Sequence, residues 1–181
     1  MARRADATRN AALLLAAARE LFDEHGPEVP LDDIARHAGV ANATLYRHFP
    51  TRGDLLVAVY AEEVTALTEH GTALLRAPSP ADALFEWLDV FVTHVTTKRP
   101  LALAATEGTQ RAELFTRWHE SMRSAARALL RRAQDQGTVR PGITADDLLS
   151  LANAAAVTAR DVPHARHLLR LLRHGCEEAR P

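Results

Sequence analysis

The chain has 181 residues, 47% of them hydrophobic, and its 22 Lys and Arg against 23 Asp and Glu give a formal net charge of −1. This apolar content excludes an intrinsically disordered chain, and a single cysteine excludes a disulfide scaffold. The near-zero charge excludes a polycation that coats nucleic acids or membranes indiscriminately, so any affinity for DNA must come from a local patch.

The N-terminal segment matches a secretory signal peptide only in outline. Arg3 and Arg4 precede the apolar run 11–18, which is the order of a basic and a hydrophobic region. The run is short and rich in alanine, and it continues in helical phase into residues 19–22, so we interpret it as part of a helix of the folded protein. Since no stretch approaches the ~20 apolar residues of a membrane span, we expect a cytoplasmic protein without membrane contact.

Apolar residues near the start of the chain follow the helical period. We expect a first helix that ends at Gly26 and Pro27. A second, short helix is predicted over about 31–38, a tight turn over 39–42 and a third helix over 43–49. The apolar stripe of the first helix, at i, i+3, i+4, i+7 and i+8, consists of Leu14, Ala17, Ala18, Leu21 and Phe22.

The rest of the chain is also helical in its pattern, and no strand pattern competes. A long helix is predicted over 52–75, followed by a linker at 76–80 that holds two prolines. Because Arg99 and Pro100 interrupt the next apolar stripe, we expect two helices there instead of one. The remaining predicted helices are 82–98, 101–107, 110–136, 144–160 and 162–176.

These segments predict an all-α fold of about nine helices. An N-terminal three-helix helix-turn-helix domain is expected over residues 1–50, with its motif at about 30–49. A long fourth helix over 51–75 joins it to a helical domain over 76–181.

The third predicted helix has two unlike sides. Leu45 and Phe49, at i and i+4, face a small core together with apolar residues of the second helix. The other side has Asn42 and Ala43 at its start, and hydroxyl, imidazole and guanidinium groups further along. A narrow tip that approaches base edges, flanked by groups that hold phosphate oxygens, is what a recognition helix in the major groove of DNA requires.

A hydrophobic skeleton, a turn glycine and a Thr-Leu-Tyr-x-His-Phe run occur in order in the first part of the chain. They are residues 14–22, Gly26, 33–35, 38–40, 44–49, Arg52 and 55–56. Over about the first 65 residues the sequence thereby resembles the DNA-binding domain of TetR-type bacterial transcriptional regulators. The remainder resembles that family only in being helical.

The resemblance implies roles for residues around the third helix. It implies backbone contacts from the Thr, Tyr and His of the run, sequence reading by Asn42 and Ala43, and a contact to a base or a phosphate by Arg47. Arg52 matches a basic residue that grips a phosphate at the start of the fourth helix. Residues 1–52 hold seven arginines and seven acidic residues, so the positive charge is local to the tip. The candidate DNA-binding residues are Arg36, Asn42, Ala43, Thr44, Tyr46, Arg47, His48 and Arg52.

The resemblance also implies a mechanism. A homodimer would place two recognition helices in successive major grooves of a palindromic double-stranded operator. We expect a repressor, because a protein bound at a promoter blocks polymerase without further contacts, and an activator is the alternative. An unknown small apolar or amphipathic ligand would bind the C-terminal domain and weaken operator binding. We expect the protein at the nucleoid, with no cofactor.

Aromatic, histidine and other side chains of the second domain fall on helices that would pack together. They are candidates to line the ligand pocket, and plain core is the alternative for each of them. The set consists of Trp87, Phe91, His94, Leu103, Thr106, Phe115, Trp118, His119 and Met122.

The last two predicted helices carry small residues and leucines that suit a dimer interface, because small side chains let helices approach closely. The histidines at 164, 167 and 174, with Cys176, lack further ligands at a recognisable spacing, so we expect no metal site. The candidate interface residues are Ala152, Ala155, Ala156, Ala159, Leu168, Leu169 and Leu172.

Two other classes of protein were weighed against a regulator. The sequence has no Gly-rich phosphate loop, no Gly-x-Ser-x-Gly and no Cys-His pair, so we do not expect an enzyme, and a helical-bundle enzyme is the remotest alternative. The second alternative class is a helical adaptor or ligand-binding protein that binds DNA weakly and without preference for a DNA sequence.

Overall fold

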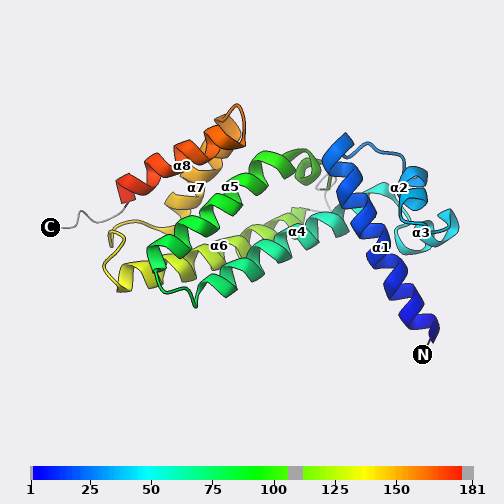
Figure 1. The fold of residues 1–181 in the computed structure, drawn as a ribbon, viewed down its shortest axis with the longest axis horizontal. Coiled ribbons are helices and arrows are strands. Elements are labelled where there is room, and N and C mark those ends of the chain that lie inside the picture. The colour runs from blue at the N-terminus through cyan, green and yellow to red at the C-terminus, as the bar shows by residue number, and fades with distance from the viewer. Residues whose placement is uncertain (1, 106–111, 177–181) are drawn as a thin grey trace. The chain divides into compact units, whose positions relative to one another are not determined.

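In the computed structural model of the chain, residues 2–105 and 112–176 are described. They form eight helices and no strand, which confirms the all-α prediction. None of these helices is long and apolar enough to cross a membrane. The helices, drawn in Figure 1, are α1 (Ala2–His25), α2 (Leu31–His37), α3 (Asn42–His48), α4 (Arg52–Leu74), α5 (Pro80–Ala105), α6 (Ala112–Asp135), α7 (Ala145–Thr158) and α8 (Val162–Cys176).

The predicted helix break at Pro100 is wrong, because α5 continues through this residue. Proline has no amide hydrogen, so it removes the one helical hydrogen bond that would reach the carbonyl of Thr96. The neighbouring bonds remain, and Leu101 and Ala105 beyond the proline are buried, at 5% and 0% exposure. One helix therefore replaces two, and the described residues hold eight helices where the sequence predicted about nine.

The chain divides into two compact units. One comprises Met1–Glu63 and Pro100–Leu114, and the other comprises Val64–Arg99 and Phe115–Pro181. The first unit therefore holds α1 to α3 with the first half of α4, and the second holds α7 and α8.

In the first unit, α2 and α3 have only seven residues each, which is too short for a stable isolated helix. They are held by burial: Ile34, Ala35 and Leu45 are all 0% exposed. Figure 1 shows α2 and α3 side by side, next to α1. Between them Gly39 has φ +66, a conformation that favours glycine, and the amide of Val40 donates to the carbonyl of Ala35 at 2.9 Å. The sequence therefore folds here into the predicted helix-turn-helix.

Trp87 of α5 occupies the core of the second unit. Its side chain is 0% exposed and stacks on Phe91, with the ring centroids 5.7 Å apart. Its Nε1 donates to the carbonyl of Leu67 on α4 at 2.9 Å. A Cβ at Gly71 would lie 2.8 Å from that Nε1 atom. Glycine in the middle of α4 therefore permits the close approach of the indole.

The helices α7 and α8 pack against each other in the second unit (Figure 1). A capping box starts α7, in which Thr144 and Asp147 bond reciprocally, and these hydrogen bonds lower the pKa of the Asp147 carboxyl. Ala152, Ala156 and Leu169 are buried, at 0%, 3% and 4% exposure. These three residues, expected in a dimer interface, thus fill the interior of a single chain.

Candidate nucleic-acid interface and effector domain

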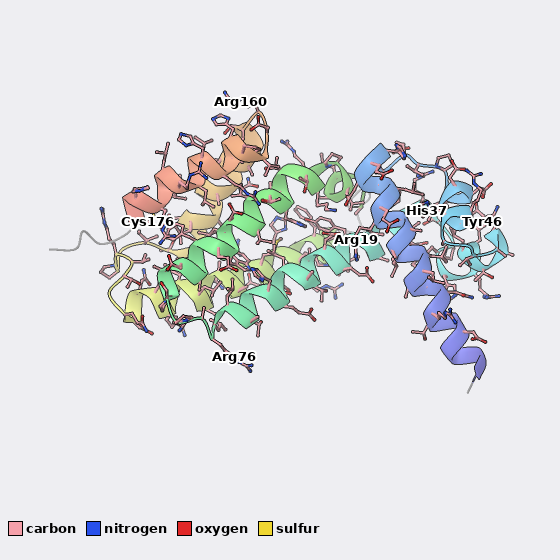
Figure 2. All side chains as sticks on the ribbon, in the orientation of Figure 1. Arg19, His37, Tyr46, Arg76, Arg160 and Cys176 are labelled. Carbon is pink, nitrogen blue, oxygen red and sulfur yellow. The ribbon has the colours of Figure 1, made fainter. Side chains whose placement is uncertain are left out.

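The outer side of α3 carries small and polar side chains. Asn42, Ala43, Tyr46 and Arg47 are exposed, Tyr46 to 47%, and Figure 2 shows Tyr46 on the side of α3 that faces away from α1. These positions lie on one face of a two-turn helix, and Leu45 on the opposite side is fully buried. The apolar side therefore fixes the helix while the polar side stays accessible.

Two further predicted residues lie at the margins of this face. Thr44 and His48 are half-buried. The His48 ring lies 6.3 Å from that of Phe49, centroid to centroid, and its Nε2 atom is buried without a hydrogen-bond partner among the described residues. The hydroxyl and the imidazole are therefore less accessible than the four exposed side chains.

Two arginines of the predicted interface differ in their surroundings. Arg47 is exposed, and its guanidinium has no ion pair or hydrogen bond within the described part of the chain. Arg36 is also exposed, but its Nη2 donates to Asp33 Oδ1 on the same helix at 2.7 Å. A phosphate would therefore compete with a carboxylate for Arg36 and not for Arg47.

Arg52, at the first residue of α4, has a role that the sequence did not reveal. Its Nη1 donates to the main-chain carbonyls of Pro27 at 2.8 Å and Val29 at 2.6 Å. These carbonyls belong to the segment between α1 and α2. Arg52 therefore holds the fold of the first unit, whatever contact its remaining donors make.

Ion pairs that sequence reasoning missed connect α1 to its neighbours. Arg19 Nη2 lies 2.5 Å from Glu62 Oε2, and its Nε lies 3.1 Å from Glu63 Oε1, both on α4. The next residue, Glu20, contacts His37 of α2, with 2.9 Å between Oε2 and Nε2. Charged residues on helix surfaces are common, so the sequence held no signal that would have singled out these three contacts.

Members of the predicted ligand pocket on α5 are core residues. Trp87 and Phe91 are buried, and His94 is only 8% exposed. Burial, and to a lesser degree the charge of Lys98, lower the pKa of His94 to about 4. The imidazole is therefore neutral at neutral pH.

The other predicted pocket residues differ in their exposure. Leu103 is 60% exposed and belongs to the first unit, and Thr106 lies outside the described residues. On α6, Met122 is buried and Trp118 half-buried, whereas Phe115 and His119 are exposed with ring centroids 4.0 Å apart. Among the described members on α6, Phe115 and His119 are therefore accessible to a ligand, and Met122 is not.

Two hollows lie elsewhere in the second unit. A groove of about 400 Å³ between α4 and α6 is lined by Leu75 and by small and hydroxyl side chains: Thr68, Gly71, Thr72, Ser121, Ser124, Ala125 and Ala128. A second, of about 350 Å³ between α5 and α8, is lined by Asp82, Phe85, Glu86, Asp89, Arg166, Leu169, Arg170 and Arg173. In the second groove, Arg166 pairs with Asp89 and Arg173 with Asp82.

Apolar side chains remain exposed on α7 and α8. Leu151, Val157 and Leu171 are 52%, 41% and 57% exposed. Of the predicted interface residues, Ala155, Ala159, Leu168 and Leu172 are half-buried and thus partly accessible. In the part of the chain that the structure describes, no group of three or more His, Cys, Asp or Glu side chains is placed to hold a metal ion.

Two protein families match the sequence. The family described as bacterial regulatory proteins, tetR family, matches residues 14–59, which cover the first unit's helix-turn-helix and the start of α4. The family described as transcriptional regulator SbtR-like, C-terminal domain, matches residues 79–177. Together they span both parts of the molecule.

Individual relatives agree with these matches. The HTH-type transcriptional regulator EthR of Mycolicibacterium smegmatis is 26% identical over 152 residues, covering 80% of this chain and 70% of the relative. An HTH-type transcriptional repressor of Mycobacterium tuberculosis is 39% identical over 80 residues, 44% of this chain and 40% of the relative. A TetR transcriptional regulator of Streptomyces coelicolor has a solved structure that is 32% identical, with a TM-score of 0.78 and coverage of 94% and 99% of the two chains.

Proposed function

Because the chain belongs to the TetR family of bacterial regulatory proteins and is a DNA-binding transcriptional regulator rather than an enzyme, we propose that it is a ligand-responsive repressor. It binds a palindromic operator as a homodimer, in the cytoplasm at the nucleoid. The observation that carries this proposal is the two-sided α3, whose buried Leu45 anchors an accessible polar face.

The exposed side chains of α3 contact two different parts of the DNA, the base edges and the phosphates. Asn42 and Ala43, at the first turn, read base edges: the Asn amide suits adenine, and the Ala methyl suits the methyl group of thymine. Tyr46 and Arg47 hold phosphate oxygens, which fix the position of the helix but carry no sequence information. Thr44, His48, Arg36 and Arg52 lie around this face and supply further backbone contacts.

A second copy of the chain covers the exposed apolar side of α7 and α8. Leu151, Val157 and Leu171 are large, and each exposes more than two fifths of its surface. Large apolar side chains left exposed on neighbouring helices are candidates for an interaction surface. A two-fold interface at these helices, with Leu168 and Leu172 at its edge, fixes the distance between two recognition helices.

The effector binds the second unit. Some of the aromatic and Met side chains that the sequence singled out are buried core, so the lining includes the accessible Phe115, Trp118 and His119 of α6. The ligand weakens operator binding, and because coupling between two sites is reciprocal, the operator weakens ligand binding by the same factor.

Selection of bound duplexes from a random-sequence pool tests this function. We expect the wild-type protein to enrich a two-fold symmetric sequence, and the variant Asn42→Ala to change the preferred base at one position of each half-site. A good base contact contributes about 1–3 kcal/mol of discrimination, which such a selection resolves. Enrichment of no sequence by the wild-type protein would contradict the proposal and favour an adaptor with non-specific affinity. An Asn42→Ala protein that keeps every base preference but binds all duplexes more weakly would remove Asn42 from the reading surface.

A further inference from the structure

We propose that Arg19 is a positioning residue for operator binding: its contacts with Glu62 and Glu63 fix the orientation of the helix-turn-helix on α4. This inference rests on the proposed binding of a palindromic operator by a homodimer. Arg19 lies on α1, on the side that faces α4 (Figure 2). None of the three residues is on the DNA-facing side of α3, so their role is distinct from contact with DNA.

The two contacts of Arg19 restrain rotation of α4 as well as distance. Nη2 lies 2.5 Å from Glu62 Oε2, and Nε lies 3.1 Å from Glu63 Oε1. Consecutive residues of a helix are about 100° apart around its axis, since 3.6 residues make one turn. A planar guanidinium that contacts both carboxylates therefore admits a narrow range of rotations of α4 about its own axis.

Arg52 supplies a second attachment on the same helix. Its bonds to the carbonyls of Pro27 and Val29 tie the first residue of α4 to the segment between α1 and α2. From Arg52 to Glu62 is ten residues, or about 15 Å at a rise of 1.5 Å per residue. Two attachments at that separation fix the tilt of the first half of α4 against α1, which a single attachment would leave free.

The link continues from α1 to the recognition surface. Glu20, the residue after Arg19, contacts His37 of α2 at 2.9 Å, and α2 packs on α3. Adjacent residues of α1 thus hold α4 and α2. The orientation of α3 relative to the first half of α4 depends on this short chain of contacts.

The Arg19 contacts are suited to setting an angle and add little to stability. The side chains of Arg19 and Glu62 are 43% and 42% exposed, and Glu63 is 17% exposed. Partly exposed ion pairs are screened by solvent and contribute little to the free energy of unfolding. Loss of Arg19 should therefore leave the first unit folded but broaden the range of angles between α3 and α4.

Binding to a full operator and to a half-operator separates orientation from contact. Each half-site is bound by one helix-turn-helix, whereas the full site is bound tightly only when the helix-turn-helix of the other copy is already aligned with its half-site. A broader range of angles between α3 and α4 lowers the effective concentration of that other helix-turn-helix at its half-site. We therefore expect Arg19→Gln to weaken binding to the full operator about tenfold or more and to leave half-site binding within about twofold.

The experiment measures fluorescence anisotropy with two duplexes: the palindrome selected by the wild-type protein, and the same duplex with one half-site scrambled. The matched control is Arg76→Gln, which removes an exposed arginine just after α4 (Figure 2) and should change neither affinity. Glu62→Gln with Glu63→Gln should reproduce the Arg19→Gln result, and Arg19→Lys should restore part of the full-site affinity.

Equal losses on both duplexes would overturn the inference, because they would show that Arg19 only supports the folding of the first unit. Unchanged affinity on both would overturn it as well. A wild-type protein that binds the two duplexes equally would overturn the proposed homodimer function, and the inference with it.

Discussion

The two compact units are held together in different ways. In the first, the seven-residue helices α2 and α3 depend on a few buried apolar residues and on polar links such as Arg52 to the carbonyls of Pro27 and Val29. In the second, Trp87 is enclosed completely and packs against glycine at position 71.

The difference matches what each unit does. A DNA-reading surface must stay accessible, so the first unit buries one side of each short helix and leaves the other side polar. The second unit packs long helices around large side chains, and it encloses the one described polar side chain that is buried, His94. Substitutions in the second unit should therefore affect stability most, and substitutions on α3 should affect binding most.

The largest expected effect concerns His94 and pH. Its pKa is lowered to about 4 in the folded protein, by burial first and Lys98 second, whereas an unfolded chain has the ordinary value of about 6.5. The unfolded state therefore binds more protons between pH 6.5 and 4. The contribution of His94 to the free energy of unfolding is fully present above pH 6.5 and is lost as the pH is lowered to 4. This contribution is about 3 kcal/mol.

Urea unfolding of wild type and His94→Gln at pH 7 and pH 4 measures this effect. The difference between the two proteins should change by about 3 kcal/mol over this range, since carboxylates elsewhere titrate equally in both. A difference that is the same at both pH values would show that the pKa of His94 in the folded protein equals its ordinary value.

The next effect concerns Gly71. Replacing a glycine inside a helix with alanine normally raises stability by up to about 1 kcal/mol. At this position the new Cβ would lie 2.8 Å from Trp87 Nε1 and 3.2 Å from Ala125 Cβ, and the enclosed indole has little space to move. We expect Gly71→Ala to lower the free energy of unfolding by about 2 kcal/mol, as overpacked cores do.

The matched control is Gly175→Ala on α8, where a Cβ meets nothing within 4 Å. This variant should be as stable as wild type or slightly more so in urea unfolding. A Gly71→Ala protein that is also more stable than wild type would contradict the tight packing of α4 on Trp87.

The fold could be predicted from the sequence wherever a local signal was sufficient. The helical period, Gly39 at the turn and the opposite sides of α3 all depend on neighbouring residues, and the structure reproduces each of them. Pro100 misled the prediction because the loss of one hydrogen bond is a local signal, while the burial of Leu101 beyond it depends on distant residues.

The candidate sites were harder to predict because they depend on which side of each helix packs against the rest of its own chain. Small residues on α7 suggested a dimer interface, yet Ala152 and Ala156 face the interior, and the large apolar side chains exposed on this helix are Leu151 and Val157. A stripe of apolar residues has the same pattern whether it meets its own chain or a second copy. The contact between Arg19 and Glu62 could not be predicted for a related reason: these residues are 43 positions apart, and no sequence pattern pairs residues at that separation.

The salt dependence of operator binding tests most directly that α3 is the DNA-binding surface. Each phosphate contact that is lost lowers the slope of log affinity against log salt concentration by about one. We predict this change for Arg47→Ala, and no change for Arg170→Ala, which removes an exposed arginine from α8 in the second unit. An unchanged slope for Arg47→Ala, or an equal change in both variants, would contradict the assignment of α3 as the surface that binds the operator.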